Sequence, residues 1–123
     1  MVSKFHWKYL MPFLLWTAFI LVASLLPSNE FPKVQVVNFD KVVHAGIYFL
    51  LVFLGWFGFH KQQTVSSKLF FTLCVMCILF GFTVEILQET CTASRHFDWY
   101  DVIANAMGVL LFAAIIKWVK KTN

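Results

Sequence analysis

The amino-acid sequence predicts an all-α fold, a bundle of four transmembrane helices with both termini on the cytoplasmic side. Of its 123 residues, 60% are hydrophobic, 19% are aromatic and only 13% are charged, which leaves too little polar surface to cover a water-soluble fold. The apolar residues form four runs of roughly 20 residues, the length that crosses a bilayer as a helix. We therefore expect residues 1–123 to form a single membrane domain.

The first two runs carry local signals for helix ends. The first is expected to end before Pro27, and Pro12 falls in its first turn, where a missing N–H costs least. The second run is expected to begin with Asp40 as its N-cap.

The last two runs are bounded by charged or aromatic residues. Lys68 and Glu89 lie at the ends of the third run, and Trp99 and Trp118 at the ends of the fourth, where tryptophan favours the membrane interface. The short connections between runs predict that successive helices are antiparallel neighbours. The four expected helices cover about residues 9–26, 40–59, 68–89 and 99–118.

Charged residues orient this bundle. Seven of the 10 basic residues fall on one side: Lys4, Lys8, Lys61, Lys68, Lys117, Lys120 and Lys121. By the positive-inside rule, that side is cytoplasmic. The 6 acidic residues fall at or near the other side: Glu30, Asp40, Glu85, Glu89, Asp98 and Asp101. The net charge is +4, but the basic residues form no stripe, so we expect the lipid bilayer and not nucleic acid as the first partner.

Polar residues within the apolar runs gather near the acidic side. Asp40, His44 and Tyr48 are spaced four apart and share one face of the second helix. Glu85 and Gln88 share a face of the third. The fourth carries a further stripe, formed by Asp98, Asp101, Asn105 and Gly108. Because ionisable residues are costly inside a membrane, their convergence predicts a functional site.

The residue types leave three kinds of site open. In an anion-handling or acid–base pocket, His44 and Glu85 would exchange protons. Lys41 and Arg95 would hold the negative group of the ligand. An ion-pair network from Arg95 to a neighbouring aspartate would instead only join helices. A divalent metal site would have four candidate ligands, namely His44, Glu85, Asp98 and Asp101. Their spacing matches no known tight metal-binding motif, and we assign no metal from the sequence.

The order and spacing of these residues resemble the VanZ-like family. The matching runs are D-K-V-V-H-A-G-I-Y-F-L-L from Asp40, E-I-L-Q from Glu85 and R-H-F-D-W-Y-D-V-I-A-N-A-M-G from Arg95. Many members carry a second glycine one turn after the first, where this chain has Leu111 and Phe112. The resemblance implies a multi-pass protein of the bacterial cytoplasmic (inner) membrane, related to one that contributes to glycopeptide (teicoplanin-type) resistance.

The resemblance and the polar stripes together imply a site on the outer face. The expected catalytic positions are His44, Glu85 and Asp101. The expected substrate-binding positions are Asp40, Lys41, Tyr48, Gln88, Arg95 and Asn105. The expected ligand is a lipid-linked or anionic component of the cell envelope, while the cofactor and the question of enzymatic activity stay open. The alternative is a non-catalytic accessory or assembly protein whose polar cluster is structural.

Overall fold

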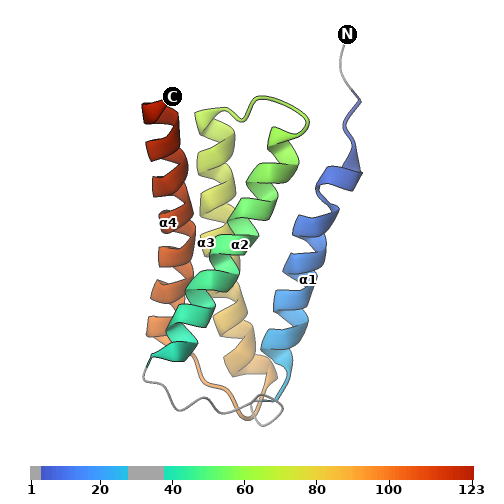
Figure 1. Ribbon diagram of the computed structural model, residues 1–123. Coiled ribbons are helices and arrows are strands. Elements are labelled where there is room, and N and C mark those ends of the chain that lie inside the picture. Colours follow the sequence, from blue (N-terminus) through green and yellow to red (C-terminus); the bar gives the residue numbers. More distant parts are fainter. Residues whose placement is uncertain (1–3, 28–37) are drawn as a thin grey trace.

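The computed structural model describes residues 4–27 and 38–123, which form four long helices and one short 3₁₀ turn (Figure 1). These elements are η1 (Trp7–Tyr9), α1 (Met11–Leu25), α2 (Phe39–His60), α3 (Ser67–Cys91) and α4 (Trp99–Thr122). The all-α class is confirmed, and all four helices lie within a few residues of their predicted bounds. Residues 28–37 of the connection before α2, with Glu30 among them, lie outside the described residues.

Three of the helices are long and apolar enough to cross a membrane, namely α2, α3 and α4. The first helix is shorter: its 15 residues give a length of about 22 Å at a rise of 1.5 Å per residue, below the bilayer core of about 30 Å. The prediction of a multi-pass membrane protein is confirmed by the three long helices. A fourth span through α1 stays a prediction.

Side chains cap two of the helices. At the start of α3, the Ser66 hydroxyl accepts a hydrogen bond from the Leu69 backbone N–H at 3.1 Å. At the start of α4, the Asp98 carboxylate accepts one from the Tyr100 N–H at 2.8 Å. Each cap pairs a backbone donor that has no partner within the helix.

The start of α2 differs from the prediction. Its N-cap is Asn38, in the left-handed conformation with φ 60°, and its side chain makes no capping hydrogen bond. Asparagine adopts this conformation more readily than most residues. Asp40 lies in the first turn instead, and its carboxylate pairs with Lys41 at 2.9 Å. A carboxylate in the first turn also interacts favourably with the helix dipole, so Asp40 is useful there without being the cap.

The helices run alternately up and down, and the two ends of the bundle carry different charges (Figure 1). The lysine-rich end holds Lys4, Lys8, Lys61, Lys68, Lys117, Lys120 and Lys121. The acidic end holds Asp40, Glu85, Glu89, Asp98 and Asp101. The start of α1 and the end of α4 share the lysine-rich end, as the antiparallel connections predict.

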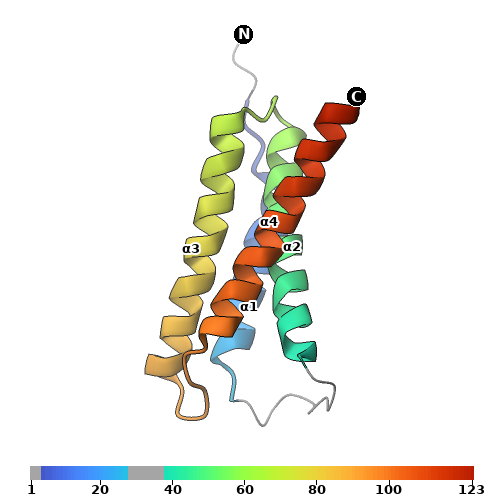
Figure 2. The same cartoon turned by 90° about the vertical axis from the view of Figure 1, so that its left-hand side faces the viewer.

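Helix α4 crosses α2 obliquely and packs closely against it (Figure 2). The crossing depends on Gly108, because a Cβ there would overlap the carbonyl oxygen of Ala45. Towards the lysine-rich end, Phe112 is buried among aromatic rings that include Phe49, Phe53 and Trp56. Phe112 thus packs beside the close crossing of α2 and α4, at a position where the resemblance to the VanZ-like family leads one to expect a second glycine.

Candidate functional site

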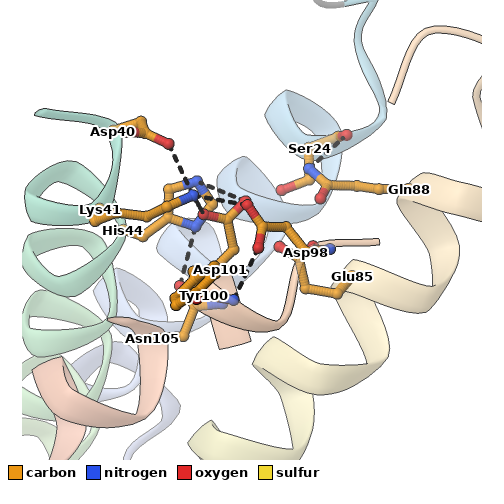
Figure 3. A network of polar contacts seen from close by, with 10 residues as sticks. All are labelled: Ser24, Asp40, Lys41, His44, Glu85, Gln88, Asp98, Tyr100, Asp101 and Asn105. Atoms are coloured by element: carbon orange, nitrogen blue, oxygen red, sulfur yellow. Dashed lines mark hydrogen bonds and ion pairs between the residues drawn. The ribbon is translucent and has the colours of Figure 1, made fainter. Parts of the chain in front are cut away.

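A cavity of about 540 Å³ opens at the acidic end of the bundle, and its walls differ in polarity. Phe19, Ile20 and Ala23 of α1, with Val43 and Ile47 of α2, give it an apolar side. Its polar lining contains seven of the nine predicted site residues: Asp40, His44, Tyr48, Glu85, Gln88, Arg95 and Asn105. The other two, Lys41 and Asp101, belong to a polar network beside it (Figure 3).

Lys41 is the centre of this network. Its ammonium group contacts Asp40 at 2.9 Å and Asp98 at 2.8 Å, and it also donates a hydrogen bond to Asp101 Oδ1. Lys41 therefore ties the start of α2 to the start of α4. With three carboxylates around it, its charge is already compensated, which argues against the predicted role of holding an anionic ligand. Asp98 and Asp101, the aspartates offered from the sequence as partners of Arg95, thus both pair with Lys41.

The ion pair with Lys41 also changes the acidity of Asp98, which lies just before α4. The hydrogen bond from the Lys41 ammonium, followed by that from the Tyr100 N–H, holds the pKa of the Asp98 carboxyl below its usual range. A depressed pKa in the folded state means that the pair stabilises the fold above the carboxyl pKa of the unfolded chain. This stabilisation is lost as the pH falls through the lower folded-state pKa.

His44 lies between α4 and the cavity. Its Nδ1 is 3.1 Å from the Asn105 side-chain oxygen, and its Nε2 is 3.9 Å from Asp101 Oδ2. Asn105 is almost fully buried, so its position is fixed by packing. The stripe predicted along α4 therefore does face the stripe along α2.

Glu85 brings a carboxylate from α3 to the same place. It is 1% exposed, and its Oε2 accepts a hydrogen bond from the Asp98 backbone N–H at 3.4 Å. No described residue pairs with its Oε1. Donor atoms of His44, Glu85 and Asp101, the three predicted catalytic positions, all lie within 4.8 Å of one another. Of the four metal ligands considered from the sequence, Asp98 is outside this group.

Two other polar side chains line the cavity, one from α2 and one from α3. Tyr48 is 3% exposed, and its hydroxyl has no hydrogen-bond partner among the described residues. The Gln88 side chain donates a hydrogen bond to the carbonyl oxygen of Ser24 at 3.2 Å, which joins α3 to α1. The lining thus includes a hydroxyl without a hydrogen bond to a described residue, and an amide that also joins two helices.

The sequence matches the VanZ/LLP1 family over residues 3–120. The chain belongs to this family. An uncharacterized protein of the fission yeast Schizosaccharomyces pombe is 31% identical to it over 80 residues, which make up 65% of this chain and 48% of the yeast protein. The aligned region therefore spans about half the length of that relative. No solved structure matches the chain.

In this VanZ/LLP1 protein, α1 supplies the part of the site that sequence reasoning missed. Its apolar wall residues look like any lipid-facing residues in the sequence, since no apolar residue of the first run shows which side faces the bundle. Ser24 was the one available signal, as a small polar residue near the acidic end of an apolar run. The relative from yeast also means that a bacterial origin stays a prediction.

Proposed function

We propose that this VanZ/LLP1 protein binds an amphiphilic, anionic component of the cell envelope in the cavity at its acidic end. The observation that carries the proposal is the contrast between the two sides of the cavity. One side consists of aliphatic and aromatic side chains from α1 and α2, and the other carries polar groups from α2, α3 and α4. A ligand with a hydrocarbon tail and a charged head would satisfy both sides.

Arg95 is the residue best suited to contact the charged head. It lines the cavity from the connection between α3 and α4. A guanidinium group binds phosphate or carboxylate through two parallel hydrogen bonds, which gives strength and orientation together. The Tyr48 hydroxyl, without a partner among the described residues, would donate a further hydrogen bond. His44 and Glu85 stand close enough together to transfer a proton to or from a bound ligand, which would make the protein an enzyme.

The lysine-rich end supports an outward-facing site. Lysines accumulate on the cytoplasmic side of membrane proteins, and seven lie at that end of the bundle. The cavity then faces the extracytoplasmic side of the membrane, where lipid-linked envelope precursors are found. In a bacterial inner membrane, this placement fits the family's association with glycopeptide resistance.

An accessory or assembly protein with a structural polar cluster is the second candidate function. It is favoured by the interhelical contacts at the acidic end, where Lys41 joins α2 to α4 and Gln88 joins α3 to α1. Interhelical hydrogen bonds of this kind stabilise membrane bundles without any ligand. The two functions predict different effects when a polar group that joins no helices is removed. Ligand binding should weaken if the cavity binds a ligand, whereas a purely structural cluster should be unaffected.

The Tyr48→Phe variant separates these functions, because the hydroxyl it removes makes no hydrogen bond with another described residue. For the protein in nanodiscs, we expect Tyr48→Phe to weaken binding of a polyprenyl phosphate about tenfold, the effect of one hydrogen bond to a charged group. Thermal stability should not fall. The same titration with the uncharged polyprenol should show little binding in either protein.

A cellular assay complements the titration. In cells deleted for the gene, Tyr48→Phe should complement survival under teicoplanin poorly while its membrane abundance stays normal. If Tyr48→Phe and Arg95→Ala both bind the phosphate and complement like the unmodified protein, the ligand-binding function is wrong. If function instead declines only in variants that lose abundance, the accessory function is correct.

A further inference from the structure

Three side chains that commonly bind divalent metals meet at the acidic end, each from a different helix. They are His44 of α2, Glu85 of α3 and Asp101 of α4, with one donor atom of each within 4.8 Å of the others. Donors of one metal ion lie about 2.1 Å from it, so two of them are up to about 4.2 Å apart. Small side-chain rotations therefore bring these atoms to metal-binding distances.

The buried carboxylate of Glu85 indicates that a cation belongs in this group. Its side chain is 1% exposed, lines the cavity and leaves Oε1 without a partner among the described residues. An ionised carboxylate buried without a partner is strongly destabilising. A metal ion bound by the Glu85 carboxylate would remove that cost, and no contact between Glu85 and another described residue does so.

The hydrogen bonding of His44 prepares its other nitrogen for a metal. Nδ1 faces the side-chain oxygen of Asn105 at 3.1 Å. Because that oxygen can only accept, Nδ1 carries a hydrogen, and Nε2, 3.9 Å from Asp101 Oδ2, is the nitrogen that a metal would use. Metal-binding histidines typically donate from their second nitrogen in this way, which fixes the tautomer and the ring orientation.

The charges around the group favour a dication. Four carboxylates gather at the site: Asp40, Glu85, Asp98 and Asp101. Among the described residues, Lys41 and Arg95 supply the lysine and arginine charges there, so the described groups leave two negative charges when His44 is neutral. Lys41 occupies Oδ1 of Asp101 and leaves Oδ2, the oxygen nearest His44, for a metal.

We propose that His44, Glu85 and Asp101 bind one divalent transition-metal ion, with Zn²⁺ as the best match to an imidazole nitrogen and two carboxylate oxygens. Three protein ligands leave at least one position open towards the cavity, since His44 and Glu85 both line it. The inference deepens the proposed function, because a metal there would attract an anionic head group to an otherwise acidic wall. It can nevertheless be tested without any amphiphilic ligand.

The test is calorimetric titration of Zn²⁺ into the full chain, purified in detergent and stripped of metal with a chelator. A Cys91→Ser background removes an exposed thiol that also binds zinc. We expect one ion per chain. Glu85→Gln and His44→Gln should each weaken binding at least about 100-fold, and Asn105→Ala about 10- to 100-fold. Glu89→Gln is the matched control, since it removes an exposed carboxylate one turn further along α3.

Each outcome decides the proposal. Circular dichroism shows which variants are folded, and His44→Gln keeps the test valid if Glu85→Gln unfolds. Absence of Zn²⁺ binding, or binding that both ligand variants retain, would overturn the metal site. Polyprenyl phosphate binding that persists without metal would leave the proposed function intact, whereas zinc binding without phosphate binding would refute that function alone.

Discussion

At the level of single residues, the acidic end depends most on Lys41. Its side chain is 26% exposed and is surrounded by Asp40, Asp98 and Asp101. Two of these carboxylates belong to α4 or its cap, so one ammonium group holds together elements that are far apart in the sequence. Removing the ammonium group costs more free energy than the ion pairs contribute, because the remaining carboxylates then repel one another.

We expect Lys41→Met to lower the free energy of unfolding by about 2 kcal/mol, because three carboxylates would lose their common cation. Thermal unfolding in detergent measures the change. Lys68→Met makes the same substitution at an exposed residue near the start of α3 and should change stability by less than about 0.5 kcal/mol. Equal losses in the two variants would show that the network around Lys41 is not stabilising.

At the level of helices, the crossing of α2 and α4 brings the two polar stripes together. Gly108 permits the close approach, and Gly81 of α3 leaves space next to Tyr48 and Asn105. In a membrane, helices gain little from burying apolar surface, so small residues that allow close packing determine which faces meet. The distances around His44 therefore depend on a glycine about one turn away from Asn105.

We expect Gly108→Ala to destabilise the bundle by about 2 kcal/mol, since its Cβ would overlap the Ala45 backbone and push α4 away from α2. Unfolding of the purified protein measures this loss. Gly46→Ala is the control, because a Cβ there meets nothing within 4 Å. Alanine favours a helix by up to about 1 kcal/mol over glycine, so the control should be unchanged or more stable. A loss at both positions would mean that helix packing at Gly108 is not the cause.

At the level of the whole molecule, the separation of charge between the two ends predicts its orientation in the membrane. Cys91 is exposed at the end of α3 and lies at the acidic end, whereas Cys74 and Cys77 are buried. The natural sequence therefore carries one accessible thiol at the end that we expect to face outwards.

A membrane-impermeant maleimide should label Cys91 in intact cells, because the acidic end is expected to be extracytoplasmic. Cys91→Ser should abolish the labelling. Lys120→Cys in the Cys91→Ser background should react only after the cells are permeabilised, since it lies at the lysine-rich end. The reverse pattern would invert the orientation and place the cavity on the cytoplasmic side. An N-terminal epitope that is accessible outside would show that α1 does not span.

Particular residues show how far the sequence could predict the structure. Helix positions follow from the lengths of the apolar runs, and the shared faces of His44 and Tyr48, or of Glu85 and Gln88, follow from helical periodicity. The sequence misplaced the cap of α2, because Asp40 is as suitable for a first turn as for an N-cap. It also did not predict that Lys41 pairs with Asp98 and Asp101, since spacing alone does not show which basic side chain the fold brings to them.

The sequence by itself determined the class of this protein, the positions of its helices, the opposite charges of its two ends and its family. These properties depend on local composition and periodicity, because a segment spans a bilayer when its apolar run is long enough to cross the hydrocarbon core as a helix. Only the tertiary structure decided that α1 supplies the apolar side of the cavity and that three carboxylates share Lys41. It alone brought His44, Glu85 and Asp101 together. Such contacts depend on the crossing of helices at Gly108, a geometry that no single helix contains.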